Sequence, residues 1–238
     1  LQYDGDLKPK GVLWTRGHRH LVMGLNFDHD GVLWGFDIHT QAVIRVDRYG
    51  RQMPEHRFAH RAFGAAAFAA DGRIFFGECL KGQTPYWGSH MEYMPGTDMI
   101  GRGHVLEFDR NWKLVREHAT ETAVELSGFK GVTHLSLHPS GDFIAYTTET
   151  GKRLMRFDVR QSRQMPDLAS VGGGDLYDRN WFIALAYRND GRLLVTRGDH
   201  VEIYAEDGRV EQRIDLAQFG YGFAQITVCA DQQHALAA

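Results

Sequence analysis

One short pattern recurs four times along the chain and limits the folds that the sequence can adopt. Each copy is an apolar run, a turn dipeptide and a second apolar run: GLNFDHDGVLWGF at 24–36, AAAFAADGRIFFG at 65–77, HLSLHPSGDFIAY at 134–146 and ALAYRNDGRLLVT at 184–196. Asp-Gly and Ser-Gly between alternating apolar residues favour tight hairpins, because glycine adopts a positive φ without a steric penalty. The pattern therefore predicts four antiparallel hairpins.

A third apolar run follows each hairpin. The four runs are VIRVDRYG at 43–50, HVLEFDRN at 104–111, RLMRFDVR at 153–160 and HVEIYAEDG at 200–208, and a less apolar fourth run follows each of them. We expect the aspartates of this pattern to cap the next turn through side-chain to backbone hydrogen bonds; they are Asp4, Asp47, Asp109 and Asp158. A repeat of about 40 to 50 residues with four strands is typical of a β-propeller blade.

The two ends of the chain carry incomplete copies of the repeat. The first residues match a third and a fourth strand, and 224–238 match a first and a second strand. The sequence therefore predicts an all-β fold with one domain over 1–238, a single β-propeller of five four-stranded blades. The N-terminal strands would pair with the C-terminal strands and remove two exposed sheet edges. The alternative is a fragment of a six- or seven-bladed propeller.

The motif apolar-x-apolar-x-x-D-G-x-L, followed by an apolar run that ends in F-D, resembles the broad NHL, SMP-30 and YncE-like group of β-propellers. The resemblance covers nearly the whole chain and implies the architecture. That group includes lactonases, lyases and binding scaffolds, so the resemblance implies no single activity. No catalytic string of the group is matched here, and function has to be argued from the site.

Composition excludes several classes of protein. Hydrophobic residues make up 43% and charged residues 24% of the chain, and the formal net charge is −3. These values predict a soluble globular protein that does not bind nucleic acid through its phosphates. No apolar run reaches the roughly 18 residues of a membrane helix, and no targeting segment is visible. Cys79 and Cys229 lack metal-ligand spacing and are expected to be buried thiols; the alternative is a disulfide bond between them.

In a propeller the first strand of each blade lines a central channel. Three rings of small or polar residues are expected there: Gly24, Ala65, His134, Ala184 and Gln225, then Asn26, Ala67, Ser136, Ala186 and Thr227, then Asp28, Ala69, His138, Arg188 and Cys229. The intervening apolar residues are expected to pack against neighbouring strands, because side chains alternate along a strand. A small polar molecule is the expected partner at the channel mouth, and the oligomeric state stays open.

Three histidines fall near the predicted mouth of the channel. His20, His60 and His134 could converge on a divalent Zn, Ca or Mg ion, with Glu78 or Asp37 completing the ligand set. Such a metal would polarise a carbonyl and activate water. The alternative is that the histidines are separate and form hydrogen bonds to loops.

Glu78, His134 and Arg197 are the predicted catalytic residues. Glu78 ends the apolar strand RIFFGE, where withdrawal from water favours a general base, and a histidine is the alternative base. Arg197 could bind a carboxylate or phosphate through two hydrogen bonds. The other interpretation is structural: Glu78 would form a salt bridge with Arg197 or Lys81, and Arg197 would pair with an acid at the mouth.

A long connection at 79–103 separates the second and third strands of one repeat. Loops longer than about 12 to 15 residues are usually functional or disordered, and the aromatic residues here favour a lid. The predicted substrate-binding residues are Tyr86, Trp87, His90, Glu92, Lys130 and Gln225. These features favour a metal-assisted hydrolase or lyase. A non-catalytic binding scaffold is the alternative, because no nucleophile motif is recognisable, and serine or cysteine nucleophiles are not expected.

Overall fold

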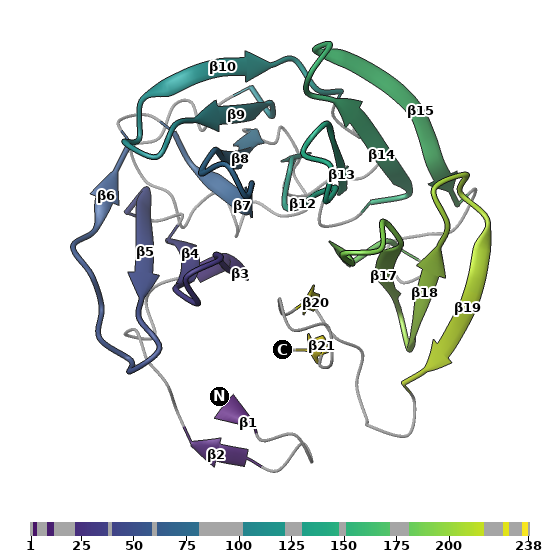
Figure 1. Ribbon diagram of the computed structural model, residues 1–238, viewed down its shortest axis with the longest axis horizontal. Helices are drawn as coiled ribbons and strands as arrows, with labels where there is room; N and C mark the ends of the chain where they lie inside the picture. Colours follow the sequence, from purple (N-terminus) through teal and green to yellow (C-terminus); the bar gives the residue numbers. More distant parts are fainter. Residues whose placement is uncertain are drawn as a thin grey trace, which may run out of the picture.

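The computed structural model describes eleven segments of the chain. They are residues 2–3, 9–11, 22–37, 40–58, 61–80, 102–121, 130–147, 151–171, 181–216, 226–228 and 235–237. Four antiparallel sheets, here called blades 1 to 4, follow one another around an arc in chain order (Figure 1). Within these segments no helix has the length and apolar character needed to cross a membrane.

Each blade has four strands in sequence order, from the centre of the arc to its rim (Figure 1). Blade 1 consists of β3 (Val22–Phe27), β4 (Leu33–Asp37), β5 (Ala42–Val46) and β6 (His56–Arg57). Blade 2 consists of β7 (Phe63–Phe68), β8 (Ile74–Leu80), β9 (Val105–Phe108) and β10 (Leu114–His118), and β11 (Lys130–Gly131) also pairs with β8. Blade 3 consists of β12 (His134–Leu137), β13 (Phe143–Thr147), β14 (Arg153–Asp158) and β15 (Arg163–Ser170). Blade 4 consists of β16 (Ala184–Tyr187), β17 (Leu193–Arg197), β18 (His200–Tyr204) and β19 (Val210–Asp215).

The prediction of five blades is wrong, because the structure has four four-stranded blades. The short strands at the two ends form separate pairs, β1 (Gln2–Tyr3) with β2 (Pro9–Gly11) and β20 (Ile226–Val228) with β21 (Ala235–Ala237). The two strands of each pair are close in the sequence, and pairing residues that are close in the sequence costs less entropy than joining the two ends of the chain. The all-β propeller is confirmed, whereas its predicted closure is not observed among the described strands.

The turn chemistry that the repeat predicts is present. The four glycines of the first turns have φ values from 74° to 89°. After the third strands, Asp47 Oδ1 accepts hydrogen bonds from the amides of Tyr49 and Arg51, both at 2.9 Å. Asp109 and Asp158 cap the equivalent turns, so their predicted role is confirmed, and Asp4 lies outside the described residues.

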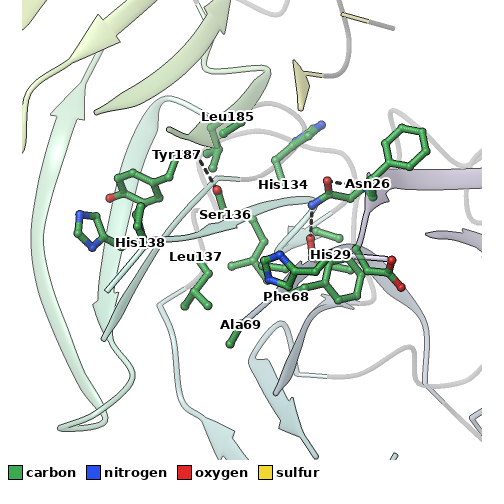
Figure 2. A pocket seen from close by; sticks show the side chains of 18 of the residues that line it. Asn26, His29, Phe68, Ala69, His134, Ser136, Leu137, His138, Leu185 and Tyr187 are labelled. Carbon is green, nitrogen blue, oxygen red and sulfur yellow. Dashed lines mark hydrogen bonds between the residues drawn. The ribbon is translucent and has the colours of Figure 1, made fainter. Parts of the chain in front are cut away.

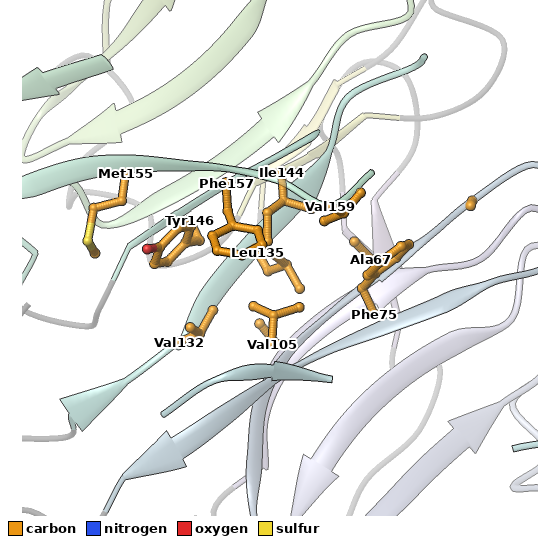
Figure 3. Packing of buried hydrophobic residues seen from close by; sticks show 12 residues of the cluster. Ala67, Phe75, Val105, Val132, Leu135, Ile144, Tyr146, Met155, Phe157 and Val159 are labelled. Carbon is orange, nitrogen blue, oxygen red and sulfur yellow. The ribbon is translucent and has the colours of Figure 1, made fainter. Parts of the chain in front are cut away.

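The hydrophobic core is divided into layers between neighbouring blades. The layer between blades 2 and 3 is aliphatic and aromatic, with Phe75, Ile144 and Phe157 almost completely buried (Figure 3). The layer between blades 1 and 2 is mainly aromatic: Phe36 and Phe76 meet edge to face with ring centres 5.2 Å apart. Both faces of blade 2 are therefore covered, which stabilises the arc through apolar burial.

This layering corrects the expected division of first-strand side chains into channel and core sets. Ala65 and Ala67, predicted for the channel, do line the cavity among the first strands, and they also pack in the layer between blades 2 and 3. Ala66, predicted for packing, belongs to the layer between blades 1 and 2. The reason is that the two faces of a blade look at its two neighbours, so both alternating sets pack between blades while the strand itself borders the channel.

A charged residue near the end of the third strand connects each of the first three blades to the next. The Arg45 guanidinium lies over the Trp112 ring of blade 2, at 5.0 Å from its centre. Glu107 of blade 2 contacts His118, which reaches Ser162 of blade 3. These contacts all involve the turn between the third and fourth strands of the following blade, and blade 3 completes the series with Arg156 Nη1 donating to Glu206 O at 3.0 Å.

Candidate functional site

A cavity of about 510 Å³ lies among the first strands of the four blades (Figure 2). Its wall includes Asn26 of β3, Ala67 of β7, His134 and Ser136 of β12, and Leu185 of β16. The first strands border it because they are the innermost strands of the arc. This location agrees with the predicted channel, and the cavity is the candidate binding site.

The polar side chains in this wall also join neighbouring blades. Asn26 Nδ2 donates to Ala66 O of blade 2 at 2.9 Å, and Ser136 Oγ accepts from Tyr187 N of blade 4 at 2.9 Å (Figure 2). The carbonyl side of Asn26 accepts from Phe27 N at 2.8 Å, which fixes the orientation of its amide. Asn26 and Ser136 are therefore rigidly placed groups in the wall.

Two histidines lie at opposite ends of the cavity. His134 begins β12, and its Nδ1 lies 3.2 Å from Thr133 Oγ1. His29 lies in the exposed turn between β3 and β4, next to Asp28, whose Oδ2 accepts from Trp34 Nε1 at 2.7 Å. No ligand-binding role was predicted for this end of the channel. The sequence signal for this end is a histidine next to the turn between the first and second strands in two of the blades, His29 in blade 1 and His138 in blade 3.

His138 lines the cavity with an imidazole that is mostly packed against aromatic rings. It stacks on Phe143 at 4.1 Å between ring centres and meets Tyr187 edge to face at 5.0 Å. Its Nδ1 lies 2.9 Å from Ser140 Oγ, and its Nε2 lies 3.3 Å from Glu206 Oε1. Burial lowers the pKa of His138 despite the nearby Glu206 carboxylate, so its neutral form is favoured in the folded protein.

Glu78, the predicted general base, is almost fully buried and engaged with blade 2. Its Oε1 lies 2.9 Å from Arg61 Nη1, and its Oε2 accepts from Arg102 N at 2.8 Å. The partner is therefore Arg61 rather than the predicted Arg197 or Lys81. Nothing in the described residues tests a catalytic role for Glu78, but two of its acceptor sites are already occupied.

Arg197 is likewise engaged within its own blade. Its Nη1 lies 3.0 Å from Glu202 Oε2, and its guanidinium lies 5.1 Å from the centre of the Phe182 ring. Burial acts to raise the pKa of Glu202, but hydrogen bonds from Tyr204, Arg213 and Arg197 lower it to about 2. Arg197 thus neutralises a buried carboxylate, which matches the structural alternative for this residue.

Most of the predicted metal-binding and lid residues lie outside the described residues. They are His20, His60, Tyr86, Trp87, His90, Glu92 and Gln225, whereas Lys130 is described only as part of β11. Within the described ranges, no group of three or more histidine, cysteine, aspartate or glutamate side chains is placed to bind a metal ion. His134 alone of the predicted set is described, so the metal site stays a prediction.

Comparisons with known proteins identify the fold. No family model and no curated protein matches the sequence. Among solved structures, a gluconolactonase from Xanthomonas campestris is 17% identical with a TM-score of 0.63, and the match covers 91% of this chain and 68% of that one. A putative gluconolactonase is 14% identical with a TM-score of 0.63, and the match covers 87% of this chain and 67% of that one.

A third similar solved structure is a lyase, an activity that also occurs in the group of propellers that the sequence resembles. Virginiamycin B lyase from Staphylococcus aureus is 12% identical with a TM-score of 0.55, and the match covers 89% of this chain and 61% of that one. Identities this low establish the fold alone. The predicted resemblance is thereby confirmed at the level of architecture: this chain has a β-propeller fold similar to those of gluconolactonases and virginiamycin B lyase.

Proposed function

We propose that this propeller binds a small polar molecule in the channel cavity and acts on it as a hydrolase or lyase. The observation that supports the proposal best is the cavity itself, which is about 510 Å³ and combines alanine and leucine side chains with His134, Asn26 and Ser136. Small-molecule sites typically occupy about 300 to 1,000 Å³ and present a few fixed polar groups in a mainly apolar wall.

The described residues supply two kinds of groups for such chemistry. His134 supplies an imidazole, the side chain that most often transfers protons near neutral pH. Asn26 and Ser136 are oriented by their bonds to Ala66 and Tyr187, so a ligand would meet them without further ordering. In this proposal His134 moves the proton, while Asn26 and Ser136 orient the substrate.

Metal assistance is the finer part of the proposal. A divalent ion bound by His20, His60 and His134 would polarise a carbonyl or phosphoryl oxygen of the substrate. The described residues provide His134 alone of this set, so no step is assigned to the ion. Elemental analysis of the purified protein checks this part. A stoichiometric divalent metal that is lost in His134→Ala would support metal assistance, whereas the absence of a bound metal from the wild type would contradict it.

Lactones are the first substrate class to test, because two solved structures with this fold are a gluconolactonase and a putative gluconolactonase. We expect hydrolysis of small sugar lactones, and a loss of at least about 100-fold in kcat/KM in His134→Ala. Asn111→Ala, in the turn between β9 and β10, is the matched control and should leave the rate unchanged. Equal rates in wild type and His134→Ala would refute the channel site.

A non-catalytic scaffold is the second candidate, and one observation favours it. The polar groups of the cavity wall already bond to neighbouring blades, and Glu78 and Arg197 are already paired. A ligand that raises Tm without being converted would support this reading, because binding to the folded state alone stabilises it. Turnover of that ligand would exclude it.

A further inference from the structure

A serine, a histidine and a glutamate meet at the rim of the propeller, between blades 2 and 3. Ser162 lies in the turn between β14 and β15, His118 ends β10, and Glu107 lies on β9. Ser162 Oγ is 3.3 Å from His118 Nδ1, and His118 Nε2 is 2.9 Å from Glu107 Oε2. The three side chains thus form a continuous relay from an exposed hydroxyl to a buried carboxylate.

The imidazole of this relay is fixed in place. His118 has no exposed surface and lies between Phe75 and Phe157, with ring centres 6.2 Å and 5.5 Å away. The hydrogen bond from His118 lowers the pKa of Glu107, so this carboxylate is ionised at neutral pH. An ionised carboxylate on Nε2 favours a proton on that nitrogen and leaves Nδ1 as the acceptor.

Arg116 determines where the serine proton points. Its Nη1 lies 3.3 Å from Ser162 Oγ and 3.5 Å from Val159 O. Because the guanidinium can only donate, it occupies a lone pair of Oγ and directs the hydroxyl hydrogen toward His118 Nδ1. The Oγ to Nδ1 distance of 3.3 Å is long, as is common for catalytic hydrogen bonds in enzymes without substrate.

The backbone at Ser162 has an unfavourable conformation for a serine. Its φ is 51°, in the left-handed region, and the corresponding turns of blades 1, 2 and 4 have Gly50 at 81°, Trp112 at 66° and Gly208 at 88°. A non-glycine residue costs energy in this region, and such residues concentrate at functional sites. Here the unfavourable φ places an exposed hydroxyl directly over the buried His118.

We propose that Ser162 is a nucleophile for acyl transfer, activated by His118 and Glu107, at a rim site separate from the channel. The substrate class is small carboxylic esters. Arg116, beside Oγ, would stabilise the negative charge that develops on the ester carbonyl oxygen. This inference does not depend on the proposed function, because none of its residues lines the channel cavity.

The chemistry needs no additional reagent besides water. Ser162 Oγ forms a bond to the ester carbonyl carbon as its proton passes to His118 Nδ1, and the bond from carbon to the alcohol oxygen then breaks as that oxygen takes the proton. Water next attacks the acyl-serine and gives a proton to Nδ1, which returns it to Ser162 Oγ as the carboxylic acid leaves. Glu107 stabilises the transient imidazolium in both halves.

A fluorophosphonate probe tests the proposal on the full chain, with mass spectrometry locating the label. Wild type is expected to be labelled on Ser162 and to hydrolyse p-nitrophenyl acetate. Ser162→Gly should abolish both, and it suits the backbone because glycine adopts a φ of 51° without a steric penalty. Ser140→Ala is the matched control, since Ser140 is also a turn serine beside a histidine, and it should retain both activities.

The role of Glu107 as a positioning residue has its own test. Glu107→Gln is expected to slow labelling on the order of 10²-fold or more, and Glu107→Asp should restore part of the rate. Circular dichroism and Tm would identify variants that fail to fold. Folded wild type that is not labelled on Ser162, or equal hydrolysis by wild type and Ser162→Gly, would overturn the proposal. The His134→Ala variant should be labelled normally, which separates failure here from failure of the channel site.

Discussion

Two histidines of this protein each lie beside a serine and a glutamate, yet the two regions are built differently. His118 has no exposed surface, and its Ser162 and Glu107 partners come from two different blades. His138 is bonded to Ser140, two residues away in the same turn, and its Glu206 neighbour is 70% exposed. The first arrangement is assembled by tertiary structure, whereas the His138–Ser140 pair forms within one turn and only Glu206 comes from the next blade.

In both clusters the histidine Nδ1 faces the serine, but the other hydrogen-bond partners of the pair differ. Ser140 N donates to His138 Nδ1 at 3.2 Å, and Asp142 N donates to Ser140 Oγ at 3.2 Å, so backbone amides occupy this pair. In the rim cluster the corresponding hydroxyl is exposed and contacts an arginine side chain. A serine, a histidine and a glutamate close together are therefore not enough for a catalytic triad. The serine oxygen and the histidine nitrogen must also not be occupied by other hydrogen-bond donors such as backbone amides.

The largest expected effect separates the two histidines by stability. His118→Ala leaves the buried, ionised Glu107 without its closest partner, and removing the partner of a buried charge costs about 3 kcal/mol or more. His138→Ala removes ring packing but leaves Glu206 in water, so a loss of about 1 to 2 kcal/mol is expected. Urea denaturation measures both values, and equal losses would contradict the comparison.

A smaller effect tests how closely His138 is enclosed. A Cβ at position 191 would lie 3.0 Å from His138 Nε2, and Gly191 has a φ of 84°. Gly31 has a similar φ of 74° and nothing within 4 Å of the added Cβ, which makes it the matched control. We expect Gly31→Ala to cost about 1 kcal/mol and Gly191→Ala about 2 kcal/mol in unfolding free energy. The same cost at both sites would show that His138 can move aside.

The dependence of stability on pH should distinguish the two clusters further. Burial lowers the pKa of His138, so its contribution is complete above the unfolded pKa of about 6.5 and is lost as pH falls through the folded value. Glu107 has a pKa lowered by its bond to His118, so its contribution is lost only below about pH 4.3. Between pH 7.5 and 5.5 the free energy of unfolding should change less with pH in His138→Gln than in wild type. An unchanged slope would argue against a neutral His138.

The smallest effects concern the two serines. Ser140→Ala removes an acceptor for Asp142 N and should cost about 1 kcal/mol. Ser162→Gly removes an exposed hydroxyl and relieves the positive φ of 51°, so its stability should stay within about 0.5 kcal/mol of wild type. Thermal unfolding checks both, and a large loss in Ser162→Gly would indicate that this serine serves the fold.

Local signals in the sequence determined much of the architecture. The Asp-Gly turns located four hairpins, and Asp47, Asp109 and Asp158 cap turns as predicted, because such features depend on neighbouring residues only. The blade count failed because it depended on pairing between the two ends, where the short strands instead pair with their neighbours in sequence.

The rim cluster was not predicted, and serine nucleophiles were not expected. Glu107 and Ser162 lie in different repeats, and no spacing rule brings them together around His118. Glu78 and Arg197 were predicted to be catalytic, with structural pairing as the alternative; the structure pairs them with Arg61 and Glu202, partners that depend on a strand register that the sequence did not reveal.

The contacts that link third strands to the next turn have a consequence for how this protein could be rearranged. Arg45 meets an indole of blade 2, the Glu107–His118 pair of blade 2 meets a hydroxyl of blade 3, and Arg156 meets a backbone carbonyl of blade 4. Although the backbone repeats, these junctions are chemically different, so each blade recognises only its own successor. Exchanging or duplicating blades would place a charged side chain against a surface that does not match it. The order of the blades therefore depends on the contacts between blades rather than on the fold of each blade.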